Sequence, residues 1–395
     1  MATKTADVVV IGGGVNGASI AMHLATLGAG RVVLVEKGGL ATGATGRSGA
    51  MVREHYLHPT LVRMAMEASE IFHNFDDAVG GDAGFQQTGR LLMFPESERD
   101  AVESNVAMNR ELGVNIRTIT PDEIGELIPQ ASLDDISMGV YEPDSGFADP
   151  VATTYAFAAQ AEALGAHILT HTEVTGIRVS AGRVAAVETP EGDIETHVAV
   201  NVAGAWSNLL GGPIGEVMPI TPTRVQMTHL RRPPALESLT MNVIDYTTGA
   251  YFRVDAGHGT LVGGEAYDDL SEAVNPNGYG LNADHSTIER YWRRANLRFP
   301  DFVNAINRGG YGSLYDMTPD GNPILDHSAV VDGLYWAVGF SGHGFKLSPV
   351  VGRMVAEFVT QGDTIDHPIR EFRASRYAEG RPLVAQHPYE GRRHQ

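Results

Sequence analysis

The stretch DVVVIGGGVNG, residues 7–17, decides the fold that the sequence predicts. Its first half is a continuous apolar run, as expected for a strand buried on both faces of a parallel sheet. The glycines follow at once, and apolar residues then recur at helical spacing from Val15 to Gly28, which favours a helix ended by a glycine cap. The order of strand, glycine turn and helix predicts the opening of a βαβ unit.

A second strand and an acidic residue complete this unit. Arg31–Val35 is apolar after its first residue and predicts a strand, and Glu36 stands at its end. In such a unit Gly12 permits the tight turn, Gly14 lets backbone N–H groups approach a pyrophosphate, and Gly17 lets the helix pack closely on the strand.

These residues indicate a dinucleotide site. The helix N-terminus carries partial positive charge that favours the pyrophosphate. Glu36 can accept hydrogen bonds from both ribose hydroxyls, which disfavours a 2′-phosphate. The alternative is a glycine-rich turn in a fold that binds no nucleotide. The loop GATGRSGA, residues 43–50, suits a second close backbone approach, as the flavin half of FAD requires, but composition alone does not separate FAD from NAD.

Composition bounds the class of protein. The chain has 395 residues, with 29 Lys and Arg against 48 Asp and Glu, so its formal net charge is −19, and 43% of its residues are hydrophobic. This is a globular composition, and the length predicts two or three domains. The acidic balance argues against nucleic acid or an anionic membrane as a partner, because either would repel such a surface.

Missing residue types exclude further chemistry. The chain has no cysteine, so disulfides, thiol nucleophiles, thiolate metal sites and thioether-linked cofactors are excluded. The histidines show no convincing metal spacing, and no metal is expected. No stretch approaches the roughly 20 apolar residues of a membrane span, and the first residues lack the cleavage site of a secretion signal. We therefore expect a cytoplasmic enzyme.

Strand and helix patterns return in the middle and at the end of the chain. A helix is predicted over Pro59–Val79, a strand over Phe85–Phe94, and alternating strands between residues 217 and 264. The predicted fold class is α/β with an α+β second domain: a discontinuous Rossmann-type domain interleaved with a mixed or antiparallel sheet. The predicted boundaries are residues 1–78, 146–212 and 333–380 for the dinucleotide domain, 79–145 and 213–332 for the second domain, and 381–395 for a C-terminal tail.

Nine motifs stand in one order along the chain. They are GGGVNG (12–17), ATGATGRSGAMVR (41–53), QTGRLLMF (87–94), DSGFADP (144–150), TEVTGI (172–177), VNVAGAWS (200–207), YFRV (251–254), TPDGNPILD (318–326) and GFSGHGFKLSPVVG (339–352). In this combination the chain resembles the FAD-dependent amine oxidase family that includes sarcosine oxidase, glycine oxidase and D-amino acid oxidase. The resemblance covers residues 6 to about 377 and favours the sarcosine oxidase branch.

The resemblance implies a reaction and a set of cofactor contacts. Such enzymes move a hydride from the carbon next to an amine nitrogen to flavin N5, and the imine then hydrolyses. The second domain, residues 79–145 and 213–332, would then be the substrate domain. The implied FAD contacts are Gly12, Gly14, Val15, Asn16, Gly17, Glu36, Lys37, Thr45, Gly46, Arg47, Ser48, Val174, Ala203, Gly204, Trp206, Gly342, His343, Gly344, Phe345 and Lys346.

The resemblance also implies a substrate clamp. In the sarcosine oxidase branch an Arg after the second glycine loop and a Lys in the GFSGHGFK loop hold the substrate carboxylate, and Arg53 and Lys346 match these positions. Two cations in one pocket of an acidic protein fit an anionic ligand. Where other branches place a carboxylate Arg, this chain has Tyr315, which is expected to line the catalytic site. The alternatives are a salt-bridge Arg53, a surface Lys346 and a core Tyr315.

Departures from the family pattern refine these expectations. Ser313 stands where the monomeric branch links its flavin to a Cys, and Ala148 where the heterotetrameric branch carries a second flavin on a His. We therefore expect one non-covalent FAD per chain and no FMN. Residues 261–265 hold no Lys, which argues against fast reaction with oxygen. Glu265 replaces a pocket His and is expected either to meet a cationic group of the substrate or to be a surface carboxylate.

The predicted function is FAD-dependent oxidation of a small, sarcosine-like secondary amine amino acid, with O2 or another electron acceptor. One alternative is a D-amino acid or 2-hydroxy acid dehydrogenase that passes electrons to a quinone or a partner protein. Another is a non-catalytic flavoprotein subunit, and the least favoured is a nicotinamide dehydrogenase. A homo-oligomer and a partner subunit both remain open.

Overall fold

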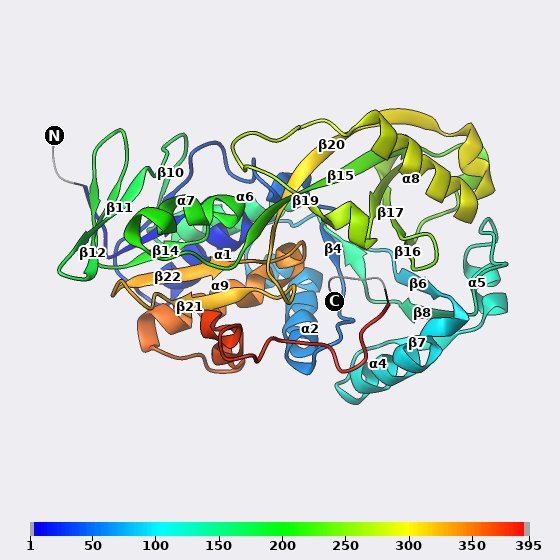
Figure 1. Ribbon diagram of the computed structural model, residues 1–395, viewed down its shortest axis with the longest axis horizontal. Coiled ribbons are helices and arrows are strands. Elements are labelled where there is room, and N and C mark those ends of the chain that lie inside the picture. Colours follow the sequence, from blue (N-terminus) through cyan, green and yellow to red (C-terminus); the bar gives the residue numbers. More distant parts are fainter. Residues whose placement is uncertain (1–3, 391–395) are drawn as a thin grey trace.

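The structure is a computed structural model that describes residues 4–390, apart from the side chain of Tyr267. Within this range the first body is built on a six-stranded sheet in the order β10-β3-β2-β14-β22-β21, parallel except for its last strand. The strands are β2 (Val8–Ile11), β3 (Val32–Val35), β10 (His167–Leu169), β14 (Ala199–Asn201), β21 (Ile324–His327) and β22 (Leu334–Val338). This arrangement confirms the predicted βαβ unit and the α/β fold class. Figure 1 shows this body on the left.

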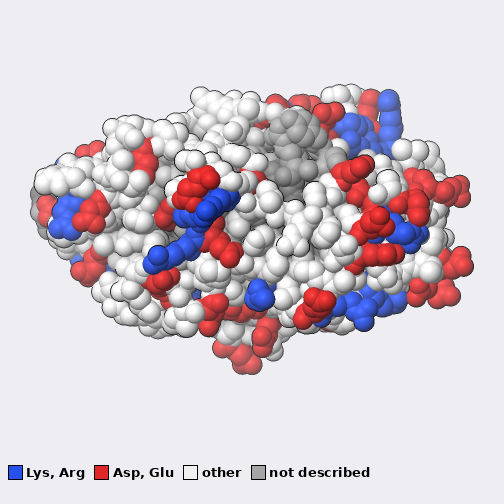
Figure 2. Space-filling model, turned by 60° about the horizontal axis from the view of Figure 1, so that its bottom comes forward, with Lys and Arg blue, Asp and Glu red and all other residues white. Residues whose placement is uncertain are grey.

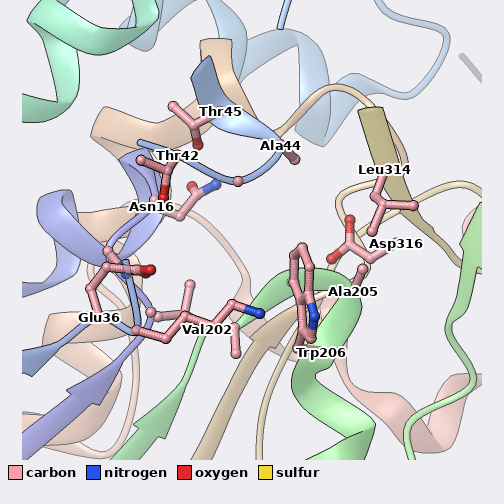
Figure 3. A pocket seen from close by; sticks show the side chains of 18 of the residues that line it. Asn16, Glu36, Thr42, Ala44, Thr45, Val202, Ala205, Trp206, Leu314 and Asp316 are labelled. Atoms are coloured by element: carbon pink, nitrogen blue, oxygen red, sulfur yellow. Dashed lines mark hydrogen bonds between the residues drawn. The ribbon is translucent and has the colours of Figure 1, made fainter. Parts of the chain in front are cut away.

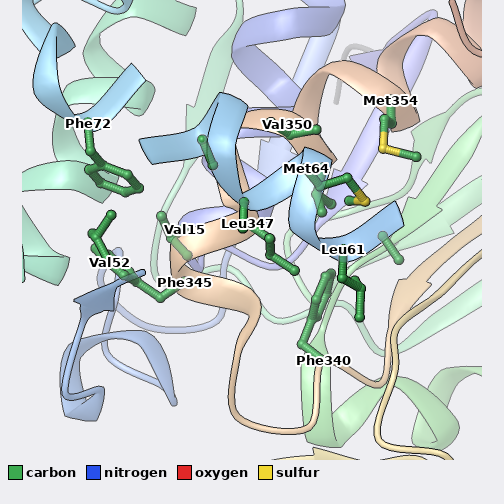
Figure 4. Packing of buried hydrophobic residues seen from close by; sticks show 14 of the residues in the cluster. Val15, Val52, Leu61, Met64, Phe72, Phe340, Phe345, Leu347, Val350 and Met354 are labelled. Carbon is green, nitrogen blue, oxygen red and sulfur yellow. The ribbon is translucent and has the colours of Figure 1, made fainter. Parts of the chain in front are cut away.

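Helices that pack on one another cover this sheet. Helix α1 (Val15–Thr26) packs against α6 (Pro150–Ala163) and α9 (Gly344–Gln361), and α9 also packs on α2 (Pro59–His73). Figure 4 shows the core between them, where Leu61 of α2 lies near Leu347 of α9. Both leucines are buried. Each such side chain contributes about 1.5–3 kcal/mol by leaving water, so the packing holds the start of α9 in place.

Capping residues fix where two helices begin. Asp149 accepts hydrogen bonds from the backbone of Val151 and Ala152 at the start of α6, as expected for an N-cap aspartate. Thr120 and Glu123 form a capping box at α5 (Pro121–Leu127).

The second body is built on a larger mixed sheet. Among the described residues this sheet has nine strands in the order β19-β15-β18-β17-β16-β6-β8-β7, with β20 also paired to β15. All its pairs are antiparallel except β16 with β6. The strands are β6 (Arg90–Phe94), β7 (Arg117–Ile119), β8 (Met138–Glu142), β15 (Thr221–Arg231), β16 (Asn242–Asp245), β17 (Ala250–Asp255), β18 (Gly259–Gly264), β19 (Glu272–Ala273) and β20 (Ile306–Met317). Figure 1 shows this sheet on the right, with α8 (His285–Arg298) along it.

Smaller elements join the two bodies or extend them. A small sheet pairs β4 (Met51–Val52), β9 (Gly146–Phe147) and β5 (Gln86–Gln87). A further sheet at the edge of the first body has the order β1-β13-β12-β11. Its strands are β1 (Lys4–Thr5), β11 (Gly176–Ser180), β12 (Arg183–Glu188) and β13 (Ile194–Glu195), and the remaining helices are α3 (Phe75–Ala78), α4 (Arg99–Glu111) and α7 (Ser207–Gly211).

Two predicted elements are interrupted in the structure. The helix expected over Pro59–Val79 ends at His73, because Asn74 leaves the helical conformation before α3 begins. The strand expected over Phe85–Phe94 is divided into β5 and β6 at Gly89, whose φ of +70° an extended strand does not permit.

The domain boundaries stay a prediction, and two sheet pairings bear on them. Residues 90–142 and 221–317 contribute to the same large sheet, because β16 pairs with β6 across 152 positions of sequence, Asn242 with Arg90. Strand β21 pairs with β22 in the six-stranded sheet, although the predicted second domain extends to residue 332.

Charged side chains are spread over the surface. On the face drawn in Figure 2, Lys and Arg occur in small groups with Asp and Glu beside them. No helix in the described part of the chain is long and apolar enough to cross a membrane.

Candidate cofactor and substrate site

A cavity of about 620 Å³ opens at the carboxyl ends of β2, β3 and β14. This is where ligands bind in open parallel sheets, and the volume is in the range of small-molecule sites. Figure 3 shows Glu36 at one end of the cavity and Asp316 with Leu314 at the other. Both bodies therefore contribute to its walls.

The glycine turn forms the floor of the cavity. A Cβ on Gly12, where φ is +121°, would lie 2.7 Å from the carbonyl oxygen of Val202. A Cβ on Gly17 would lie 1.9 Å from the oxygen of Gly12, so only glycine lets the turn and α1 pack this closely. Helix α1 has no acidic residue in its first turn. Its N-terminus is therefore a suitable place for a phosphate.

Glu36 lies at the end of β3, where the sequence places it. Its Oε2 accepts a hydrogen bond from the backbone N–H of Gly13 at 2.7 Å, and its Oε1 accepts one from Gly38 at 2.8 Å. These two bonds fix the carboxylate beside the cavity. Each oxygen keeps a lone pair that a ribose hydroxyl could use.

The second glycine loop packs on the first. Thr45 Oγ1 accepts a hydrogen bond from the backbone of Val15 at 3.2 Å. Arg47 donates to the carbonyl oxygens of Thr42 at 2.6 Å and Gly43 at 3.1 Å, so it shapes this loop. The Oδ1 of Asn16 is buried and accepts no hydrogen bond from the described residues, which fits a donor on a bound ligand.

The wall opposite this loop comes from both bodies. Trp206 lies at the end of a 3-10 turn after β14, with Lys37 Nζ 3.8 Å from its ring centroid. The indole Nε1 donates a hydrogen bond of 2.7 Å to Oδ1 of Asn277. Asn277 belongs to a loop of the second body, whose residues Tyr279 and Leu281 also line the cavity.

The far end of the cavity is formed by β20 and the loop before α9. Asp316 Oδ2 accepts a hydrogen bond from Gly339 N–H at 2.7 Å, and burial raises the pKa of Asp316 to about 6. Burial, with Glu265 nearby, also raises the pKa of Tyr315 above its usual range. Gly342 has a φ of +90°, and a Cβ there would lie 2.5 Å from the Tyr315 ring.

The two predicted clamp residues are buried cations beside this end. Arg53 and Lys346 are each 7% exposed. Burial, with Arg53 and Arg90 nearby, lowers the pKa of Lys346 well below its usual range, and Glu265 opposes this shift. The Arg53 guanidinium lies 4.0 Å from the ring centroid of Tyr56.

These two cations differ from Arg90 in their partners. Arg90 forms a buried ion pair of 2.7 Å with Glu142. No carboxylate among residues 4–390 lies within 4.0 Å of the charged nitrogens of Arg53 or Lys346. Buried charges are normally paired, so an anionic ligand would supply the counter-charge that these two side chains lack.

Most of the predicted cofactor residues line the large cavity. They are Gly12, Gly14, Val15, Asn16, Gly17, Glu36, Lys37, Thr45, Arg47, Ser48, Val174, Ala203, Gly204, Trp206, Gly342, Gly344 and Phe345, and Tyr315 lines it as well. Five predicted site residues lie outside its lining: Gly46, Glu265, His343 and the two clamp residues, Arg53 and Lys346.

The reasons for these exceptions are local. His343 is buried, with Nε2 2.7 Å from the carbonyl oxygen of Gly321 and Nδ1 3.4 Å from the hydroxyl of Tyr56. Gly46 is needed because a Cβ would lie 2.4 Å from the carbonyl oxygen of Ala41. Both residues hold their loops in shape.

Several cavity residues are not predicted by the sequence patterns. Asp316 lies beside the predicted Tyr315, and its place before the TPDG turn is the only local signal for it. The loop residues Asn277, Tyr279 and Leu281 stand in the segment NPNGYGL, which predicts a turn but not its position over the cavity. In the described part of the chain no group of three or more His, Asp or Glu could hold a metal ion.

A glycine turn at a helix N-terminus, an acidic residue placed for a ribose and a cavity between two bodies are typical of a dinucleotide-binding protein. The family model for "FAD dependent oxidoreductase" matches residues 7–358, and the chain belongs to this family. Membership confirms the predicted FAD. The open glycine cradle, the fixed Glu36 carboxylate and the buried Asn16 Oδ1 fit this cofactor.

Individual relatives are similar over nearly the whole chain. Mitochondrial sarcosine dehydrogenase of Mus musculus is 28% identical over 387 residues, which cover 94% of this chain and 42% of that protein. This chain thus spans less than half of that relative. Sarcosine oxidase subunit beta of Rhodobacter capsulatus is 28% identical, with 95% of this chain and 90% of the relative covered.

Solved structures show the same fold. L-proline dehydrogenase from P. horikoshii matches with a TM-score of 0.88 and 29% identity, covering 96% of this chain and all of that chain. Glycine oxidase from Geobacillus kaustophilus matches with a TM-score of 0.81 and 24% identity, covering 95% and 99% of the two chains. The second match shows the fold alone.

Proposed function

We propose that this protein oxidises a small amino acid whose nitrogen is a secondary amine, of the sarcosine type. The observation that carries this proposal is the pair of buried cations, Arg53 and Lys346, without a carboxylate partner among the described residues. A carboxylate in this position would supply the missing counter-charge. Such a ligand would lie beside Tyr315, at the end of the cavity opposite Glu36.

The comparisons support the substrate class. Sarcosine and proline, named in the relatives, both combine a carboxylate with a secondary amine nitrogen. The two cations would recognise the carboxylate, and the names of the relatives favour the secondary amine. We infer that the substrate is an acid of this class and leave its side chain open.

The roles of the chain's own residues follow from their positions. The glycine turn, Glu36 and Asn16 would hold FAD, which when bound accepts the hydride from the carbon next to the amine nitrogen. Arg53 and Lys346 would hold the carboxylate and so orient that carbon. Tyr315 would close one side of the site. The imine product then hydrolyses in water, and the electrons pass to O2 or another acceptor.

We also propose that FAD is bound without a covalent link and that one FAD serves each chain. The chain has no Cys, and Ser313 and Ala148 are both buried. Denaturation of the holoprotein in acid should therefore release all of the flavin into the supernatant. Flavin that stays with the precipitate would contradict this proposal.

The substrate class is tested by anaerobic reduction of the flavin in the purified holoprotein. Sarcosine, N-methyl amino acids and L-proline are compared with glycine, D-alanine and lactate, and the loss of the visible flavin absorbance is recorded. We expect at least one secondary amine to bleach the flavin and lactate to leave it unchanged. Bleaching by lactate or D-alanine alone would favour the 2-hydroxy acid or D-amino acid alternative, and no bleaching by any compound would favour a non-catalytic subunit.

The clamp is tested with Arg53→Ala and Lys346→Met. Each should raise KM for the acid substrate by on the order of 100-fold, because removal of one buried charge partner costs 2 kcal/mol or more. Arg63→Ala is the matched control, since Arg63 lies exposed on α2. Unchanged KM values in both clamp variants would contradict the proposal.

A further inference from the structure

The last described residues of the chain pack against α4 and His55. The segment 381–390, drawn red in Figure 1, runs beside α4. Asn105 of α4 donates a hydrogen bond of 2.8 Å to the carbonyl oxygen of His387, and the backbone N–H of Glu390 donates one of 2.8 Å to Oε1 of Glu98. These bonds hold Tyr389 between them. The segment that the sequence predicts as a tail is thus packed as far as residue 390, and residues 391–395 lie outside the described ones.

Tyr389 is inserted into the protein interior. It is 3% exposed, and its ring packs on Phe94 and Tyr246, with centroids 4.9 and 5.2 Å away. Its hydroxyl lies 2.9 Å from Nε2 of His55, and the two rings are stacked with centroids 6.1 Å apart. His55 itself is fully buried.

His55 in turn contacts the proposed carboxylate-binding arginine. The NH1 of Arg53 donates a hydrogen bond to the backbone carbonyl oxygen of His55. The backbone N–H of His55 donates to Oε1 of Glu142 at 2.8 Å. The backbone N–H and the carbonyl oxygen of His55 are therefore both hydrogen-bonded. The orientation of the Arg53 guanidinium depends on the position of the His55 carbonyl oxygen.

We propose that Tyr389 is a positioning residue for the substrate carboxylate, acting through His55 on Arg53. This inference rests on the proposed function of Arg53. Tyr389 contacts neither the large cavity nor Arg53 directly, so its effect on binding would travel through the imidazole and the backbone of residue 55.

The physical reason is the cost of an unsatisfied buried group. Burial lowers the pKa of His55 to about 3, so the imidazole is neutral at ordinary pH. Nδ1 of His55 is buried without a hydrogen-bond partner among the described residues, so without the Tyr389 hydroxyl neither ring nitrogen would be paired. The cost of two unpaired buried nitrogens favours a shift of the ring. A shift of the backbone oxygen would move the guanidinium, and small displacements in a binding site have large effects.

The test measures binding of acetate, a carboxylate with no amine to oxidise, to the holoprotein by the change in the visible flavin spectrum. Four proteins are compared: wild type, Tyr389→Phe, Arg53→Ala and the double variant. We expect Tyr389→Phe to raise the acetate Kd about 3–10-fold and Arg53→Ala to raise it further. In the Arg53→Ala background, Tyr389→Phe should add less than about 2-fold, because the two residues act on one interaction.

A kinetic readout separates positioning from general damage. Tyr389→Phe should raise KM for the amine substrate while the limiting rate of flavin reduction changes little. Tyr335→Phe is the control, since the Tyr335 ring packs on Phe358 of α9 with 5.6 Å between centroids and, among the described residues, contacts neither His55 nor Arg53. This control should leave the acetate Kd unchanged.

The outcomes distinguish this inference from the proposed function. If Arg53→Ala leaves acetate binding unchanged, the proposed clamp is wrong. If Arg53→Ala weakens binding and Tyr389→Phe does not, only the positioning role is overturned. An equal effect of Tyr389→Phe with and without Arg53 would also overturn it, because a merely structural role acts regardless of the arginine.

Discussion

A lysine buried beside an arginine binds a proton less readily than one in water. Lys346 is in this position, since burial and the charges of Arg53 and Arg90 lower its pKa well below the usual lysine range. Only its protonated form attracts a carboxylate. A rise in pH therefore removes the charge of Lys346 while Arg53 stays charged.

This predicts a pH dependence of anion binding. As pH rises through the lowered pKa, Lys346 loses its charge and the Kd of acetate should increase. The increase should begin below the usual lysine pKa of about 10.4 and should be much smaller in Lys346→Met. Acetate is the suitable probe because it has no amine that titrates in the same range. A wild-type Kd that stays constant up to pH 10 would contradict this prediction.

At the scale of the element, a single loop of the second body covers the cofactor cavity. Arg224 of β15 holds its base, with hydrogen bonds to the carbonyl oxygens of Gly280 at 3.0 Å and Asn282 at 2.7 Å. The bond from Trp206 to Asn277 holds its tip against the first body. The loop is thus held at its base by Arg224, and the Trp206–Asn277 bond holds its tip to the first body.

Removing that bond should loosen the cofactor. Asn277→Ala is expected to speed the release of FAD from diluted holoprotein by about 2–10-fold, the equivalent of one hydrogen bond between uncharged groups. Release is followed by the rise in free flavin fluorescence. Asn282→Ala is the control, because this exposed residue in the same loop uses only its backbone. Equal release rates in the two variants would show that the Trp206–Asn277 hydrogen bond does not help to retain FAD.

At the scale of the whole molecule, the turn before β21 anchors the C-terminal segment. Asp320 forms a buried ion pair with Arg376 at 2.8 Å, where both side chains are at most 2% exposed. It also accepts a hydrogen bond from the backbone of Leu383 at 2.9 Å. Burial raises the pKa of Asp320, but the bonds from Arg376 outweigh this and leave it lowered.

Breaking this pair should destabilise the protein strongly. Asp320→Asn leaves the Arg376 charge buried without a counter-charge, and we expect a loss of about 3–5 kcal/mol in the free energy of unfolding. Asp363→Asn is the control, because its pair with the exposed Arg370 has a distance of 3.4 Å and contributes below about 1 kcal/mol. Urea unfolding of both variants measures the difference, and similar midpoints would refute the prediction.

The sequence alone determined the parts of this protein whose interactions are local. The apolar run before Gly12, the glycine turn and Glu36 all lie within one βαβ unit, so their spacing predicts both the fold and the dinucleotide site. Asp149 caps the helix that directly follows it. In these cases the residues that interact are separated by at most one or two elements. Their spacing in the sequence therefore predicts their arrangement in the structure.

Only the tertiary structure decided which distant residues meet. Trp206 and Asn277 are 71 positions apart, and His55 and Tyr389 are 334 apart. No local pattern records such pairs, because the fold brings the two segments together by packing α9, α4 and the large sheet around the same site. The same packing directs His343 onto the carbonyl oxygen of Gly321, a partner that its motif does not indicate. Side-chain direction depends on which neighbours are near, and that is a property of the folded chain.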